Sequence, residues 1–355
     1  MKSKTLAVLA TLGLVAGTLV SPQPAQAAAH KIFVGITLND AALTAGEDSK
    51  LTDNAITRVF PDGDGTIPPV SDPVTQYALA EGMTRIALST KIQAKFVDDG
   101  HGTWNQGMAD TKTRLQEYVT AGFTEVYYTE HHEPEADLSS STYKTNYTKA
   151  GGVFPTVNSL SGTYRPFVKV GHALTRQWVD NTAGRTWKTY DTGLGDFFAG
   201  DMYMNSWYGG ANVATSYEAA STFLASFGAY RFDGLSAALT TDNRDRMFFE
   251  LGSIGLPADT NGNGRNLWLQ SVHQAVNQWD LASKGWNFIG WIWWGVDGTP
   301  GTALAGSPGI GTKRFFQLDV RHTGGIPSSN GFQTFAAGTG SAIDRFNQIS
   351  AYNNS

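Results

Sequence analysis

Two glutamates, each at the end of a short apolar run, are the residues of this sequence best suited to chemistry. Glu133 lies in Tyr-Tyr-Thr-Glu-His-His-Glu-Pro-Glu (127–135), and Glu250 lies in Met-Phe-Phe-Glu-Leu-Gly-Ser (247–253). Both runs are typical of buried parallel strands, whose carboxyl ends meet at one rim of a sheet. Two carboxyl groups that converge there can act on one bond, one as an acid and one as a nucleophile, which is the chemistry of glycoside hydrolysis.

The two glutamates differ in how strongly the sequence favours a catalytic role. A solvated loop carboxylate is an alternative for Glu133, because the chain has 31 Asp and Glu residues. A structural role is a weaker alternative for Glu250, because a carboxylate directly after Met-Phe-Phe is costly to bury unless it is hydrogen-bonded or used. The acid must keep its proton near neutral pH and the nucleophile must stay ionised. His132 and Tyr203 are the hydrogen-bond donors expected nearby.

The sequence predicts that eight strands, with helices between several of them, position these residues. Helical spacing of apolar residues occurs at Thr111–Thr120, Tyr217–Phe227 and Arg265–Ser283. This alternation, the number of strands and the lack of a Gly-rich phosphate turn after the first strand favour a single-domain (β/α)8 TIM barrel over a doubly wound sheet. The strand-like runs are Ile32–Thr37, Ile56–Phe60, Arg85–Ser89, Glu125–Thr129, Pro166–Gly171, Phe197–Met204, Met247–Leu251 and Phe288–Trp293.

The two ends of the chain differ in composition from the part between them. Residues 1–27 have the pattern of a secretory signal peptide, with Lys2 and Lys4 before an apolar stretch that is short for a membrane span. We therefore expect residues 28–355 to form the catalytic domain of a secreted, extracellular protein. Residues 295–340 are rich in Gly, Ser and Thr, and are expected to form a long loop before a last helix at about 341–352.

The composition restricts the class of partner. The net charge is −5 with no long run of Lys or Arg, which argues against nucleic acid. The chain has no cysteine, so thiol catalysis and cysteine-ligated zinc are excluded. Its ten Trp residues favour a sugar ligand, because flat aromatic rings stack on sugar rings. We expect a polysaccharide substrate, no membrane partner once the signal is removed, and a monomer.

Short motifs end the fourth, sixth and seventh predicted strands. They are His132-Glu133, Asp201-Met202-Tyr203 and Glu250-Leu251-Gly252. Together they resemble glycoside hydrolase family 26, the barrel β-mannanases and related enzymes of clan A. The resemblance implies a retaining enzyme that needs no cofactor and no metal, with Glu133 as acid/base, Glu250 as nucleophile, and Asp201 and Tyr203 as supports of the nucleophile.

The resemblance also concerns the substrate. The Trp-rich eighth strand, Trp291-Ile292-Trp293-Trp294, is similar to the family's platform beneath the sugar, a role that would belong to Trp293. The family implies β-1,4-mannan as the first substrate, followed by mixed-linkage β-glucan and β-1,3-xylan. After Glu133, however, the chain reads Pro134-Glu135-Ala136-Asp137, where the family usually has a short apolar or Asn-containing turn. This departure leaves the choice of polysaccharide open.

Further aromatic and histidine residues follow or end predicted strands. Trp104, Trp207, Tyr208 and Trp293 are expected to stack on sugar rings at the same rim, although each alone could equally be a core residue. His172 follows the fifth predicted strand. It is expected either to donate a hydrogen bond to a sugar hydroxyl or to be a core histidine with satisfied hydrogen bonds.

Other motifs carry weaker signals. Asp259-Thr260-Asn261-Gly262-Asn263-Gly264 matches the first half of a calcium loop, but position twelve is Gln270 and not Glu, so a polar turn is the simpler interpretation. His131-His132-Glu133 does not have the spacing of a zinc helix motif. Gly252-Ser253-Ile254-Gly255 does not have the spacing of an esterase nucleophile. Two alternatives remain, namely the same chemistry on another polysaccharide, including a bacterial surface glycan, and a non-catalytic carbohydrate-binding protein.

Overall fold

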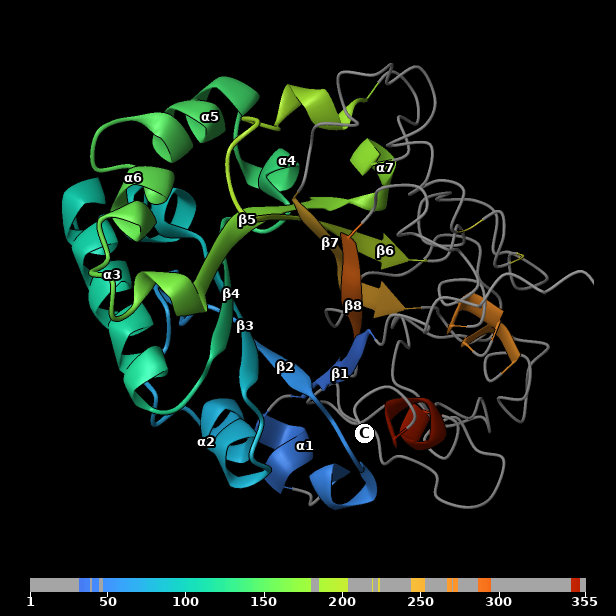
Figure 1. Ribbon diagram of the computed structural model, residues 1–355. Helices are drawn as coiled ribbons and strands as arrows, with labels where there is room; N and C mark the ends of the chain where they lie inside the picture. Colours follow the sequence, from blue (N-terminus) through green and yellow to red (C-terminus); the bar gives the residue numbers. More distant parts are fainter. Residues whose placement is uncertain are drawn as a thin grey trace, which may run out of the picture. The chain divides into compact units, whose positions relative to one another are not determined.

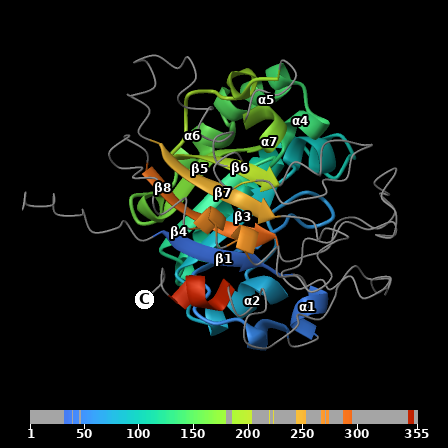
Figure 2. The same ribbon diagram turned by 90° about the vertical axis from the view of Figure 1, so that its right-hand side faces the viewer.

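Eight parallel strands form a nearly closed barrel in this computed structural model, and their order is β1-β8-β7-β6-β5-β4-β3-β2. The strands surround a central axis in Figure 1, and the arrows of β1, β6 and β7 point the same way in Figure 2. They are β1 (Phe33–Thr37), β2 (Ile56–Val59), β3 (Arg85–Thr90), β4 (Glu125–Glu130), β5 (Val168–Thr175), β6 (Phe197–Tyr203), β7 (Asp245–Gly252) and β8 (Asn287–Trp294).

The first and second strands lie side by side and close the ring. The N–H of Ala55, just before β2, donates to the carbonyl oxygen of Val34 at 3.1 Å, and the Thr57 hydroxyl donates to the carbonyl oxygen of Ile36 at 2.9 Å. The structure describes residues 32–38, 40–44, 47–179, 185–203, 219, 223, 244–252, 267–269, 271–273, 287–294 and 346–351.

Helices α2, α3, α5 and α6 lie outside the part of the barrel formed by β2–β5 (Figure 1). Helix α3 is longer than the predicted Thr111–Thr120, because a capping box of Thr103 and Gln106 starts it at Trp104. The helical segments are α1 (Asp40–Thr44), η1 (Glu47–Lys50), α2 (Pro73–Ala80), the π-helix η2 (Ile92–Val97), α3 (Trp104–Thr120), α4 (Pro134–Asp137), α5 (Ser140–Thr148), α6 (Val153–Asn158), η3 (Arg165–Phe167), α7 (Arg176–Val179) and η5 (Trp187–Thr189).

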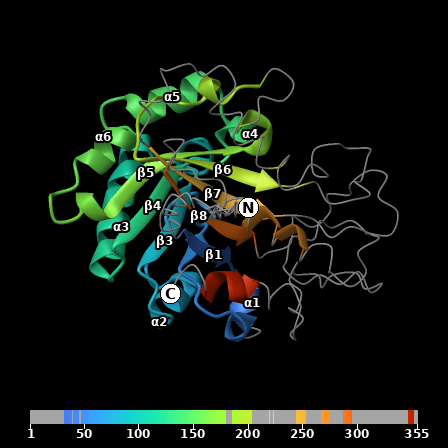
Figure 3. The same ribbon diagram turned by 45° about the vertical axis from the view of Figure 1, so that its right-hand side comes forward.

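A helix near the carboxyl terminus, residues 346–351, lies beside β1 and α1 (Figure 3). Its Phe346 ring packs edge-on against Trp291 of β8, with ring centres 6.0 Å apart. The Ser350 hydroxyl donates to the carbonyl oxygen of Asp53 at 2.9 Å. This helix therefore covers the outer side of the seam where β8, β1 and β2 meet.

The core has two layers because side chains alternate between the two faces of a strand. The inner layer fills the barrel below the carboxyl ends of the strands, with Phe33, Tyr127, Phe197, Met247 and Phe249 among its members. The outer layer lies between the strands and the helices and is the larger of the two. The barrel is thus packed with side chains, and polar groups inside it are found toward the carboxyl ends of the strands.

The predicted (β/α)8 barrel is confirmed, and the eight predicted strand runs coincide with β1–β8 to within a few residues. The predicted signal segment 1–27, the loop 295–340, the calcium-like loop at Asp259 and most of the helix Tyr217–Phe227 lie outside the described residues. Residues 267–269, 271–273 and 346–351 are helical, as expected. No helix of the described part is long and apolar enough to cross a membrane.

Candidate active site

Three carboxyl groups meet at the carboxyl ends of the strands. Glu133 lies on the turn after β4, Asp201 lies on β6, and Glu250 lies opposite Asp201 on β7. An irregularity in the β6–β7 pairing between Gly200 and Asp201 brings these two acids into register. One oxygen of each of the three carboxyls lies within 4.8 Å of the others. The two glutamates predicted from the sequence are therefore brought together, with Asp201 beside them.

Arg58 supplies the positive charge of this cluster, and sequence reasoning missed it. Its Nη1 donates to Oε1 of Glu250 and lies 3.7 Å from Oδ1 of Asp201. The Ser89 hydroxyl fixes the other edge of the guanidinium, with Nε and Nη2 at 3.1 and 3.0 Å. The rings of Phe60 and Phe249 each lie with their centre 4.5 Å from the guanidinium carbon. The guanidinium is thus held in one place by hydrogen bonds on two edges and by contacts with two aromatic rings.

Glu250 accepts hydrogen bonds from two donors. Besides Arg58, the hydroxyl of Tyr203 on β6 donates to Oε2 of Glu250. Charge-assisted hydrogen bonds of this kind favour a carboxylate over a carboxylic acid. Because Glu250 is 5% exposed, it is nearly dry and its position is fixed. These are the properties that a nucleophilic carboxylate requires.

Glu133 has the opposite electrostatic environment. Burial raises the pKa of Glu133 well above its usual range, and the negative charges of Glu250 and Glu135 raise it further, against Arg58 and Lys91. The carboxyl therefore keeps its proton near neutral pH. A carboxyl that is protonated at neutral pH and lies beside an ionised one matches the acid of a two-carboxylate pair.

The backbone that presents Glu133 is strained. His131 and Glu133 have φ angles of 62° and 53°, in the left-handed region that non-glycine residues rarely adopt. Each such residue costs about 1 kcal/mol or more. The N–H of Glu133 donates to the carbonyl oxygen of Ala173 on β5 at 3.0 Å, which holds the turn in this conformation. The strain allows the chain to turn sharply after β4 and direct Glu133 toward β7.

Asp201 is fully buried, and burial together with the charge of Glu250 raises its pKa well above the usual range. The described residues offer its two oxygens no hydrogen bond of ordinary geometry. Three carboxyls so close together resemble the ligands of a hard cation. Arg58 supplies a positive charge at Glu250 and near Asp201, which offsets part of the negative charge of the cluster.

The histidines before Glu133 are both neutral. Burial and the charge of Arg58 lower the pKa of His132 well below its usual value, and its ring lies edge-on to Phe60 with ring centres 5.7 Å apart. His131 is fully buried, and burial lowers its pKa to about 4. Nε2 of His131 lies 2.9 Å from Oδ2 of Asp137, the last residue of α4. Thus His132 lies near Arg58 of the cluster, whereas His131 contacts Asp137 at the end of α4.

Two of the predicted sugar-binding residues lie in the outer layer instead. His172 is fully buried, with Nδ1 at 2.7 Å from the Tyr143 hydroxyl and Nε2 at 3.0 Å from the Thr192 hydroxyl, so it is a core histidine with satisfied hydrogen bonds. The predicted strand ended at Gly171, but β5 continues to Thr175, which leaves His172 in mid-strand facing the helices. Trp104 begins α3, is 8% exposed, and donates from Nε1 to the carbonyl oxygen of Gly151 at 3.0 Å.

Trp293, the expected sugar platform, is not directed toward the carboxyls. Its side chain is fully buried and packs on Trp268 at a ring-centre distance of 6.3 Å. Its partners in the neighbouring strands, Ile36 and Leu251, also belong to the outer layer, so alternation directs all three side chains away from the barrel axis. Trp207, Tyr208 and the side chain of Trp294 lie outside the described part of the chain.

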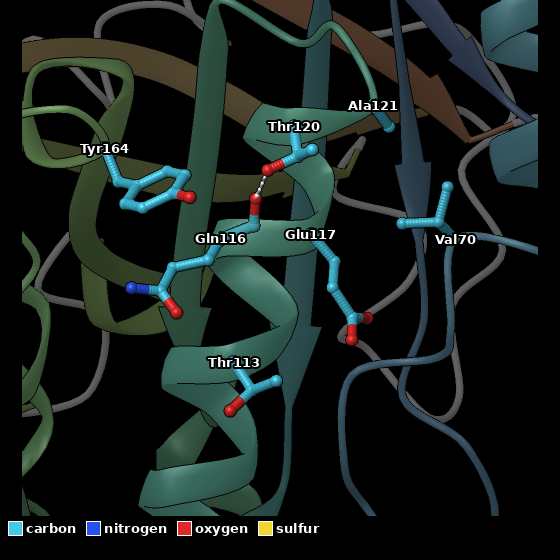
Figure 4. Close-up of a pocket in the computed structure, with 7 residues that line it drawn as sticks. All are labelled: Val70, Thr113, Gln116, Glu117, Thr120, Ala121 and Tyr164. Atoms are coloured by element: carbon cyan, nitrogen blue, oxygen red, sulfur yellow. Dashed lines mark hydrogen bonds between the residues drawn. The ribbon is translucent and has the colours of Figure 1, made fainter.

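A hollow on the outer face of α3 is separate from the carboxyl cluster. Figure 4 shows the Tyr164 ring and the Gln116 side chain on one flank and Val70 on the other. None of its seven lining residues is a predicted site residue. They are Val70, Thr113, Gln116, Glu117, Thr120, Ala121 and Tyr164.

The fold is similar to that of solved glycoside hydrolases. The catalytic domain of the family 26 endo-β-1,4-mannanase of Bacillus sp. JAMB-750 has a TM-score of 0.50 and 15% identity, with 91% of this chain and 86% of that chain covered. A modular endo-β-1,4-mannanase from Cellulomonas fimi has a TM-score of 0.47 and 12% identity, with 90% and 70% covered. A family 128 oligosaccharide-binding protein from Trichoderma gamsii has a TM-score of 0.44 and 14% identity, with 93% and 99% covered.

At these identities the similarity concerns the fold alone, a (β/α)8 barrel that this chain shares with solved glycoside hydrolases. A scan against protein-family models and a search of curated proteins found no match.

Proposed function

We propose that this protein is a secreted retaining glycoside hydrolase that cleaves a β-linked polysaccharide, with Glu133 as acid/base and Glu250 as nucleophile. One observation carries the proposal: two carboxyls with opposite environments lie with oxygens no more than 4.8 Å apart. Retaining enzymes have their two carboxyls about 5–5.5 Å apart, whereas inverting enzymes need about 6.5–9.5 Å to admit a water. The spacing therefore supports retention of configuration.

In the first step, Glu133 donates its proton to the glycosidic oxygen while Glu250 attacks the anomeric carbon. The bond to the leaving sugar breaks, and a covalent glycosyl–enzyme forms on Glu250. Glu133, now ionised, then takes a proton from a water that attacks the anomeric carbon, which releases Glu250 and restores the acid. Arg58 and Tyr203 donate hydrogen bonds to the Glu250 carboxylate before the attack and again after the second step has released it.

β-1,4-Mannan is the first substrate that we propose, and it rests on the motif resemblance. Mixed-linkage β-glucan, β-1,3-xylan and bacterial surface glycans come next. The turn Pro134-Glu135-Ala136-Asp137 differs from the family pattern and lies directly beside Glu133, so it bears on which sugar fits there. An endo mode of action is part of the proposal.

The test is the release of reducing sugar from each polysaccharide by the wild type, Glu133→Ala and Glu250→Gln. We expect activity on one polymer, its loss in Glu250→Gln with binding retained, and partial rescue of Glu133→Ala by azide. A 2-fluoro glycoside of the matching sugar should form an adduct on the peptide that contains Glu250. Glu117→Gln, which removes a carboxylate on the outer face of α3, is the matched control and should retain wild-type activity.

A wild type that binds a polymer but neither cleaves any polymer nor forms the adduct would refute the proposal. That outcome would favour a non-catalytic carbohydrate-binding protein. An adduct on a residue other than Glu250 would refute the assignment of the nucleophile, but the protein would still be a retaining glycoside hydrolase.

A further inference from the structure

The carboxyl of Glu135 is placed between the acid/base turn and the end of β5. Its Oε1 accepts two hydrogen bonds from Thr175, one from the backbone N–H and one from the hydroxyl, both at 2.6 Å. Thr175 is the last residue of β5 and pairs with Asp201 of β6. The partner of Glu135, Thr175, therefore lies in the same row of strand residues as Asp201 and Glu250.

The short helix α4, which carries Glu135, is fastened on both sides of Glu133. On the β5 side, the Glu135 carboxylate binds Thr175, and the N–H of Glu133 binds the carbonyl oxygen of Ala173. On the β3 side, Lys91 Nζ donates to Oδ2 of Asp137 at 2.5 Å. These bonds hold a turn that contains left-handed residues and would otherwise relax.

The charge of Glu135 acts on Glu133 as well. Burial raises the pKa of Glu135, and the two hydrogen bonds from Thr175 offset part of this rise. In its ionised form Glu135 is one of the groups whose negative charge raises the pKa of Glu133. The charged and titratable groups that act on Glu133 from the surrounding elements are Arg58 of β2, Lys91 after β3, Glu135 of α4, Asp201 and Tyr203 of β6, and Glu250 of β7.

We propose that Glu135 is a positioning residue for Glu133: it fastens the acid/base turn to the end of β5 and places a second negative charge beside the acid. This inference rests on the proposed function for its kinetic consequences. Glu135 lies within the turn that departs from the family pattern, so this role of Glu135 is inferred from this chain and is not carried over from the resemblance.

Two variants separate the effect of the Glu135 charge from the effect of its hydrogen bonds to Thr175. Glu135→Gln keeps an oxygen for Thr175 and removes the charge, so the alkaline limb of the kcat/KM profile should move to lower pH by roughly one unit. Glu135→Asp keeps the charge but is too short for both hydrogen bonds. It should leave that limb in place and lower kcat with little change in KM. Glu117→Gln has the same change in net charge as Glu135→Gln and should leave the profile unchanged.

An alkaline limb that stays in place in Glu135→Gln would overturn the electrostatic part of the inference, and a wild-type kcat in Glu135→Asp would overturn the positioning part. A second readout does not depend on turnover. In protein labelled with ¹³C at glutamate carboxyls, the signal that disappears in Glu133→Gln reports the titration of Glu133. Its midpoint should fall in Glu135→Gln even if no polysaccharide is cleaved, so failure of the inference and failure of the proposed function are distinguishable.

Discussion

Replacing Glu130 by glutamine should make the free energy of unfolding less dependent on pH. Glu130 ends β4 and is fully buried behind the strand, on the side away from the proposed chemistry. Burial raises its pKa to about 8, whereas the N–H groups of Gln93 and Ile92 and the charge of Lys149 lower it and only partly offset this effect. The folded protein therefore holds a neutral carboxyl at this position at neutral pH.

The magnitude follows from the two pKa values. In the unfolded chain the ordinary value is 4.5, so between that pH and about 8 the folded state keeps a proton that the unfolded state has lost. Stability then falls as the pH rises, by about 1.4 kcal/mol for each unit, or roughly 3 kcal/mol from about pH 5 to about pH 7. Glu130→Gln has no proton to lose at this position. Its stability relative to the wild type should increase by that amount over the same interval.

The assay is urea unfolding of the wild type and Glu130→Gln at a series of pH values, followed by tryptophan fluorescence. The difference near about pH 4, where both side chains are neutral, measures only the packing of the amide. The slope of the difference above that pH measures the titration. Glu117→Gln, whose parent side chain is 41% exposed, is the control and should give a small difference without slope. A difference between wild type and Glu130→Gln that stays constant from about pH 5 to about pH 7 would refute the reasoning.

Three further predictions concern the carboxyl cluster. Arg58→Met should lower kcat at least about 100-fold while polysaccharide binding persists, since it removes a fixed charge from Glu250; equal losses in binding and turnover would contradict this. Tyr203→Phe should lower kcat about tenfold or more, and unchanged kinetics would exclude its hydroxyl from the mechanism. In the wild type, hydrolysis should fall on the alkaline side as Glu133 loses the proton held by its raised pKa, and Glu133→Ala with azide should lack that limb.

The barrel and its two glutamates could be predicted because they depend on local patterns. Apolar runs at regular intervals identify the strands, and a parallel sheet places the ends of all its strands at one rim. Glu133 and Glu250 each follow such a run, so their convergence needs no knowledge of side-chain packing. Tyr203 could be named for the same reason, because it ends β6 beside Glu250.

Arg58 could not be found in this way, although the sequence contains a signal for it. An arginine in the apolar run Ile56–Phe60 has to pair with an anion if it faces the barrel interior. Its partner, Glu250, lies 192 residues away along the chain, and β2 meets β7 only across the closed barrel. The contact between Arg58 and Glu250 therefore depends on the closure of the barrel and cannot be predicted from either strand alone.

The positions of His172 and Trp293 could not be predicted from the sequence, because alternation depends on details of strand length and pairing. For His172 the length of β5 decided the outcome, because four more residues of strand turn an end position into a central one. For Trp293, the pairing register of β8 decided which face of the strand its side chain occupies. The pairing of β7 with β8 is irregular between Arg246 and Met247 and again between Phe248 and Leu251, and such a shift changes which residues of a strand face the axis.

In the proposed mechanism, the distribution of hydrogen-bond donors distinguishes the acid from the nucleophile. Arg58 brings one positive charge to three carboxyls, and full ionisation of all three in a nearly dry site would leave an uncompensated negative charge. Protons must therefore remain on some of them. Glu250 receives the guanidinium and the Tyr203 hydroxyl, whereas the described residues offer no such donors to Glu133 or Asp201. The protons accordingly stay on Glu133 and Asp201, and of these two it is Glu133, half-buried on its turn, that can meet a glycosidic oxygen.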